Sequence, residues 1–225
     1  MLRPSKSRPA HVPVPYQEPR WPATLAVLAA SALAWALPAS VAPGPRGLLP
    51  AVVVGLLVPT VIAHHARRPR LNAFLGLATL VVLTAGLIAA LVLLVVAAVR
   101  HAERPVALLG SALALWSSNV LIFASWYWRL DAGGPHQREL KAGHETGAFL
   151  FPQMTLDGPA GCERDGTPWS PRFIDYFFFA FNTSTAFSPT DVPVLARWAK
   201  VLMMLQSLLS VLIVALLAAR AVNIL

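Results

Sequence analysis

Long apolar runs constrain this chain more than any other feature of its sequence. They lie at about 22–37, 47–63, 71–99, 106–128 and 201–219, and roughly 20 apolar residues are enough for a helix to cross a bilayer. Only 12% of the 225 residues are charged, whereas soluble domains carry about 25%. The sequence therefore predicts an all-α integral membrane protein with five transmembrane helices.

The net charge of +8 comes from basic residues in the N-terminal tail and in the segments between apolar runs. This placement is typical of membrane topology signals and does not indicate a nucleic-acid partner. The single cysteine, Cys162, excludes an intramolecular disulfide and a multi-cysteine metal site. The runs show no serine–histidine pair, metal motif or phosphate loop. We therefore expect no enzyme, no metal and no cofactor, with the lipid bilayer as the main partner.

The pattern divides the chain into four regions. Residues 1–21 are basic and proline-rich and predict a disordered tail. Residues 22–128 hold four transmembrane helices, and residues 129–170 form a long polar loop. Residues 171–225 hold a pore-loop-like segment and the final transmembrane helix.

The first run also resembles a secretory signal, because Ser40-Val41-Ala42 is a small-residue cleavage pattern. Pro43 directly after the candidate cut should hinder cleavage. We prefer an uncleaved helix that continues to about Leu37 and at most to Ala42.

Small and polar residues mark the third and fourth runs. Gly76 and Gly86 offer small faces for helix packing. Serines at heptad spacing in the fourth run (Ser111, Ser118 and Ser125) predict interhelical hydrogen bonds. Asn119 lies beside them, and an amide at membrane depth needs a partner.

The stretch 173–193 is too polar for a lipid-facing span and too apolar for a loop. Ser170 and Pro171 predict a helix start, and a polar cluster follows the aromatic part of this helix. We expect a re-entrant segment beside a polar path, with a sixth full span as the alternative. Asp175 should anchor the start of this helix, and Asp191 the start of the last one. The path residues are Asn119, Asn182, Thr183, Ser184, Thr185, Ser188, Thr190, Asp191 and Gln206, and the structural residues are Asp175, Pro189 and Pro193. Gln206 and Ser210, four residues apart, should share one face of the final helix.

The segment from Phe179 to Asp191 resembles the pore loop of potassium-channel-type proteins. In those proteins an aromatic pore helix leads to Thr-x-Thr-Thr-Val-Gly-Tyr-Gly-Asp and then to an inner helix. Thr183, Thr185 and Asp191 match without gaps, as do Phe179 and Phe181. The resemblance implies a pore-loop fold. Under a channel-like function we expect a homo-oligomer, with small ions as partners.

The filter positions depart from that family, because residues 186–190 read Ala-Phe-Ser-Pro-Thr. A carbonyl-lined filter needs glycine at two positions of positive φ, and Ser188 and Thr190 adopt that conformation only at a cost. Pro189 fixes its own φ and restricts Ser188. We therefore expect no potassium selectivity through a ladder of carbonyls.

A second resemblance covers most of the chain. An uncharacterised bacterial family, the domain-of-unknown-function 1345 membrane proteins, is similar at Asn119, Trp126–Trp128, Phe151-Pro152, Asp175-Tyr176, Thr185-x-Phe187-x-x-x-Asp191 and Asn223. The resemblance implies a small bacterial inner-membrane protein and no established activity.

The distribution of basic residues predicts a cytoplasmic N-terminus, with the re-entrant segment entering from the same side. Potassium-channel pore loops enter from outside, so this orientation differs from theirs. Our leading hypothesis is a channel-like or transport-related protein. The alternative is a non-conducting membrane scaffold or assembly protein in which the polar cluster is an internal hydrogen-bonded plug.

Overall fold

The structure is a computed structural model that describes residues 18–100, 103–140, 147–156, 161–162, 169–185 and 192–222. These residues are helical or irregular, apart from an isolated bridge between Phe149 and Val194. Four stretches among them are long and apolar enough to cross a membrane, which confirms the all-α membrane-type fold. They are Leu48–His65 (α2), Pro69–Val99 (α3), Pro105–Leu140, which begins with α4 (Pro105–Leu130), and Arg197–Ala219 in α7 (Arg197–Val222).

The first apolar run forms a shorter helix, α1 (Trp21–Trp35). Its 15 residues extend about 22 Å at about 1.5 Å each. It ends two residues before the expected Leu37, because Leu37 precedes Pro38 and a residue before proline disfavours the helical conformation. Leu37 and Val41 remain buried after the helix has ended.

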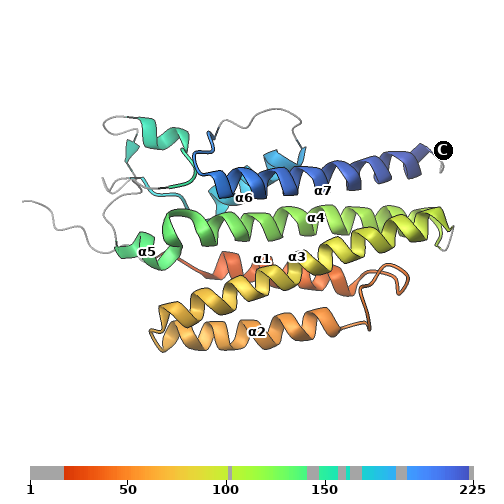
Figure 1. The fold of residues 1–225 in the computed structure, drawn as a ribbon, viewed down its shortest axis with the longest axis horizontal. Helices are drawn as coiled ribbons and strands as arrows, with labels where there is room; N and C mark the ends of the chain where they lie inside the picture. The colour runs from red at the N-terminus through yellow and green to blue at the C-terminus, as the bar shows by residue number, and fades with distance from the viewer. Residues whose placement is uncertain are drawn as a thin grey trace, which may run out of the picture.

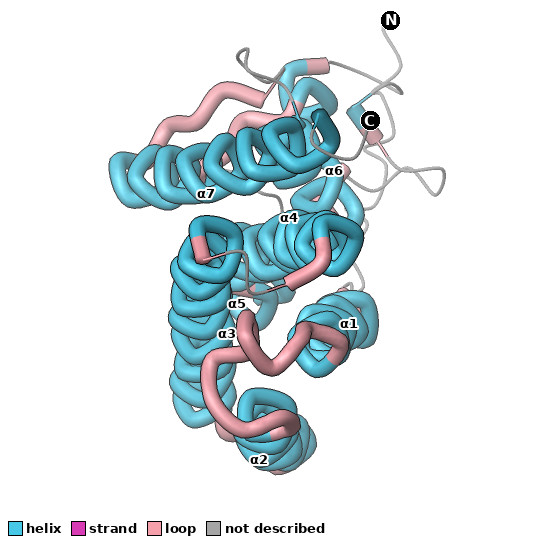
Figure 2. The backbone as a smooth tube through the Cα atoms, turned by 90° about the vertical axis from the view of Figure 1, so that its right-hand side faces the viewer, coloured by secondary structure: helices cyan, strands magenta, loops and turns pink. Residues whose placement is uncertain are grey.

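Helix α4 occupies the centre of the bundle (Figures 1 and 2). It packs against α1 and α3 on one side and against α6 (Phe173–Thr185) and α7 on the other, while α2 packs on α3 and α1. The short helix α5 (Pro135–Leu140) lies at one end of the bundle (Figure 1). We call this the α5 end. Helices α1, α3, α6 and α7 begin there, whereas α2 and α4 end there.

Residues 129–170 are more structured than the expected polar loop. Their described part contains the end of α4, the 3₁₀ turns η1 (Asp131–Gly133) and η2 (Pro152–Thr155), and α5. Phe149 and Phe151 are buried against α4 and α6. Phe149 contacts the rings of Tyr127, Phe179 and Trp198. This segment is therefore part of the core at the α5 end.

The interhelical role expected for the serines of α4 is wrong for Ser111 and Ser125. Their hydroxyls donate to the carbonyls of Ala107 and Leu121 in the same helix, at 2.7 and 2.8 Å. A serine hydroxyl reaches the carbonyl four residues earlier without a partner helix.

Candidate functional site

Helix α6 lies alongside the first half of α7, and both run away from the α5 end (Figure 1). Near the start of α6, the ring of Phe173 contacts Trp128 at the end of α4. At its other end, the carbonyl of Ser184 accepts a 2.7 Å hydrogen bond from Ser210 of α7. Thirteen residues reach about 20 Å, less than the roughly 30 Å of a hydrocarbon core.

Gln206 joins α4, α6 and α7. Its Oε1 accepts a 2.6 Å hydrogen bond from the Tyr127 hydroxyl. Its Nε2 donates to the Ala180 carbonyl at 2.7 Å and to Ser184 Oγ at 2.8 Å. Gln206 and Tyr127 are both 0% exposed. We call this set, with Asn119 and Ser210, the Gln206 network.

Asn119 enters the network from α4 through its Nδ2, which donates to the Gln206 carbonyl at 3.2 Å. Its Oδ1 is buried without a hydrogen-bond partner. Every other polar side-chain group of the network has a partner within the protein. The network therefore fills the space between the three helices with internal hydrogen bonds.

The structure thus brings together three of the predicted path residues: Asn119, Ser184 and Gln206. Thr183 is buried and donates to its own helix at the Phe179 carbonyl. Asn182 is half-buried and Thr185 is exposed. On α6 the latter two turn away from the Gln206 network, because Ala180 and Ser184 define the face toward α7.

The expected structural residues lie at the two ends of the segment. Asp175 is in the first turn of α6, and its Oδ2 accepts a 2.7 Å hydrogen bond from the Arg172 backbone. The carbonyl of Pro193 accepts from the Leu150 backbone at 3.0 Å. Ser188, Pro189, Thr190 and Asp191 lie outside the described residues.

A buried ion pair at the α5 end is a feature that sequence reasoning missed. Arg138 of α5 donates to Glu18 from Nε and from a terminal nitrogen, at 3.1 and 2.8 Å. Its other terminal nitrogen donates to the carbonyls of Trp128 and Asp131. The Trp128 indole also donates to Glu18. Glu18 is therefore packed, whereas the sequence predicted a disordered tail up to residue 21.

A second buried carboxylate, Asp131, follows α4 directly. Its Oδ2 accepts a 2.6 Å hydrogen bond from the Tyr176 hydroxyl of α6, and its Oδ1 accepts from the Ala148 backbone. Asp131 is 0% exposed. It therefore fixes the start of α6 to the end of α4 and to the 147–151 segment.

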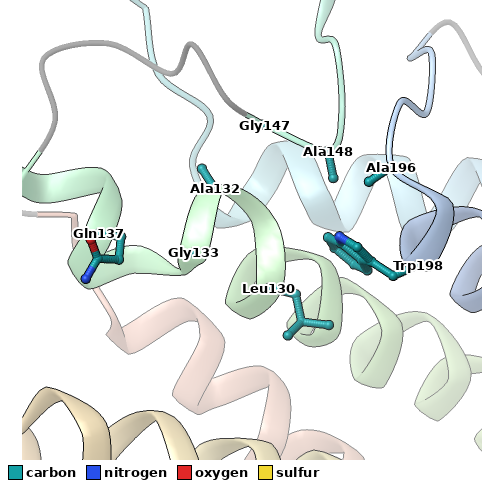
Figure 3. A pocket seen from close by; sticks show the side chains of 8 residues that line it. All are labelled: Leu130, Ala132, Gly133, Gln137, Gly147, Ala148, Ala196 and Trp198. Atoms are coloured by element: carbon teal, nitrogen blue, oxygen red, sulfur yellow. The ribbon is translucent and has the colours of Figure 1, made fainter.

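An open cavity of about 350 Å³ lies at the α5 end, where η1 meets the start of α7 (Figure 3). Trp198 and Leu130 form its apolar side, and Gln137 lies on α5 (Figure 3). None of its described lining residues is acidic, basic or nucleophilic. No group of three or more histidine, cysteine or acidic side chains approaches metal-binding geometry within the described ranges.

Tyr127 and Glu18 each carried a weak signal in the sequence. Tyr127 belongs to the aromatic group 126–128, which is typical of a membrane interface. That its side chain points into the bundle depends on how α4 is rotated about its axis. Glu18 is the only acidic residue among the first 21. A lone carboxylate beside an apolar run is a signal for a specific partner.

No protein-family model matches the chain, and neither does any curated protein or solved structure.

Proposed function

We propose that the chain is a multi-pass membrane protein in which α6 is a re-entrant half-helix, and that copies assemble into a channel-like or transport-related complex. The observation that carries the proposal is the polar, uncovered side of α6. Asn182 is half-buried and Thr185 exposed at the inner end of a helix that reaches only part of the way across. Polar groups at such depth are stable beside protein or a water-filled path.

The position of the flanking segments supports re-entry. Phe173 at the start of α6 contacts Trp128, and Leu195 beyond the segment donates to the Ala148 carbonyl. Both contacts are at the α5 end. In this proposal the segment leaves the α5 end along α6, reaches the depth of Ser210, and returns to the same end. It therefore enters the bundle without crossing it.

Five crossings agree with this arrangement when α1 is counted. Trp21 at its start is 65% exposed, as suits a membrane interface. Beyond Trp35 the non-helical segment stays packed through Leu37 and Val41, which are 2% and 0% exposed. Irregular backbone at this depth is tolerated because it is buried in protein.

The path, in this proposal, runs between copies of the chain. The Gln206 network closes the inner side of α6 with internal hydrogen bonds, so Asn182 and Thr185 on the other side are the groups available to small ions. The residues 186–190 carry no glycine, so selectivity would come from side chains and not from a carbonyl ladder. Phe178 and Ile174, which are 59% and 64% exposed on α6, supply apolar area for the contact between copies.

We place the protein in the inner membrane of a bacterium with the α5 end in the cytoplasm. Arg67, Arg68 and Arg70 lie around the end of α2 and the start of α3, and Arg172 and Arg197 at the starts of α6 and α7. These helix ends are all at the α5 end (Figure 1). Basic residues are enriched on the cytoplasmic side of membrane proteins.

A non-conducting scaffold is the second candidate, and the Gln206 network favours it. All but one of the polar side-chain groups in that network are satisfied within one chain. Such a network stabilises a bundle without any path for ions.

Ion flux through liposomes containing the purified protein separates the two candidates. The channel-like function predicts flux above that of empty vesicles, and Thr185→Val should change it several-fold, since valine keeps the shape and removes the hydroxyl. Ser111→Ala is the control, because this hydroxyl bonds to the Ala107 carbonyl within its own helix. Flux equal to that of empty vesicles, across pH and membrane potential, would leave the scaffold as the function.

A further inference from the structure

A second cavity, of about 410 Å³, lies among α1, α2, α3 and α4 near the α5 end. Leu25 of α1 and Val61 of α2 line it and are 53% and 41% exposed. Side chains that line a cavity and also face outward mark its opening. The cavity therefore opens between α1 and α2, on the side that faces lipid in a membrane.

The walls of this cavity are mainly apolar, and its charged groups gather at the helix ends. Leu57, Leu80 and Val27 form the deeper part. Arg20 and Arg129 line the part next to the α5 end, together with His64. The cavity is therefore amphipathic, with its cationic end where headgroups lie in a bilayer.

The Arg129 guanidinium packs closely against Gly76 of α3 in the wall of the cavity. A Cβ added to Gly76 of α3 would lie 1.9 Å from the Arg129 guanidinium carbon, so the guanidinium occupies the space that any side chain at position 76 would fill. One terminal nitrogen donates to the Asn72 carbonyl at 3.2 Å. Within the described part of the chain, no carboxylate lies within ion-pair distance of Arg129.

Arg20 is the second cation, and its charge is shared. One terminal nitrogen bonds Glu139 at 3.0 Å and the other lies 2.9 Å from His64 Nδ1. Its Nε is buried without a partner. Arg20 is thus paired with one carboxylate, while Arg129 has none within ion-pair distance among the described residues, which leaves an excess positive charge at the polar end of the cavity.

We propose that this cavity binds an anionic phospholipid, with the phosphate at Arg129 and Arg20 and an acyl chain along the apolar wall. Guanidinium groups bind phosphate oxygens through paired, charge-assisted hydrogen bonds. Basic cavities between transmembrane helices on the cytoplasmic side suit anionic headgroups. The lateral opening gives a membrane lipid direct access, which a water-soluble anion lacks. This inference does not depend on whether the protein conducts ions.

The test uses the full chain, purified in neutral detergent and freed of lipid. Native mass spectrometry measures binding of phosphatidylglycerol, and of phosphatidylcholine, which has a phosphate but no net charge. We expect phosphatidylglycerol to bind more tightly. Arg129→Gln should weaken its binding about tenfold or more, as loss of a charged hydrogen bond does. Arg104→Gln, an exposed arginine at the opposite end of α4, should leave it unchanged.

Val61→Trp tests the cavity without changing any charge. The tryptophan should fill the opening and reduce lipid binding by a similar factor. Because Val61 is exposed, this variant should fold, and it tests the proposal even if Arg129→Gln fails to fold. Equal binding of the two lipids, or unchanged binding in Val61→Trp, would overturn the proposal. Thermal protection by inorganic phosphate alone, equal to that by the lipid, would assign the arginines to a soluble anion and would also overturn it.

Discussion

The Tyr127 hydroxyl donates a 2.6 Å hydrogen bond to Gln206 Oε1, and both side chains are completely buried. Tyr127 belongs to α4 and Gln206 to α7, while the Gln206 amide nitrogen bonds two groups of α6. One side chain therefore sets the relative positions of three helices. These bonds fix the C-terminal half of α6 against α4 and α7.

Gln206→Leu should lower the free energy of unfolding by about 1–3 kcal/mol, because it leaves the buried Tyr127 hydroxyl without its acceptor and removes the hydrogen bonds to Ala180 and Ser184. Thermal unfolding in detergent measures the loss. Met204→Leu is the matched control, since Met204 is on the same helix and 64% exposed. Equal stability of Gln206→Leu and the wild type would show that the network carries no net energy.

Tyr127→Phe and Gln206→Leu should be non-additive. Each substitution removes the same 2.6 Å hydrogen bond, so the double variant should lose less stability than the sum of the single losses. Coupling between directly bonded residues is typically about 0.5–3 kcal/mol. A double-mutant cycle on unfolding midpoints gives the coupling, and a value near zero would contradict the bond.

The apolar runs predicted most of the fold. The starts and ends of α2, α3 and α4 lie within two residues of their expected positions, since each run is long and Pro69 and Pro105 mark the first turns of α3 and α4. The shared face of Gln206 and Ser210 could also be read locally, because four residues make about one helical turn.

The partners of the buried charged groups could not be read in this way. Glu18 and Arg138 are 120 positions apart, and no local pattern specifies such a pair. The same holds for Gly76: the sequence predicted a small face for helix packing, but not that the Arg129 guanidinium of α4 would occupy it. Which residue fills a small face depends on how α3 and α4 are rotated about their axes.

Arg138→Met should lower the free energy of unfolding by about 3–5 kcal/mol, the usual cost of leaving a buried charge unpaired. Glu18 keeps its hydrogen bond from Trp128 in this variant but loses the cation. The double variant Glu18→Met/Arg138→Met should recover part of the loss, because no uncompensated charge remains. Thermal unfolding measures both variants, with the exposed Arg104→Met as control. A double variant less stable than Arg138→Met would contradict this account.

The effect of Gly76→Ala on stability should change sign with the residue at position 129. In the wild type the new methyl group collides with the Arg129 guanidinium, 1.9 Å from its carbon, so the arginine must leave its seat and stability should fall by about 1–3 kcal/mol. In an Arg129→Ala background the collision is absent, and alanine should stabilise α3 by up to about 1 kcal/mol through its higher helix propensity.

Gly110→Ala in α4 is the matched control for this pair, because an added Cβ there meets no atom within 4 Å. It should stabilise the protein slightly in both backgrounds. The test compares the unfolding midpoints of the wild type, Gly76→Ala, Arg129→Ala and the double variant. If Gly76→Ala has the same effect with and without Arg129, the guanidinium does not pack on α3. The position of Arg129 in the wall of the cavity proposed to bind lipid would then be contradicted.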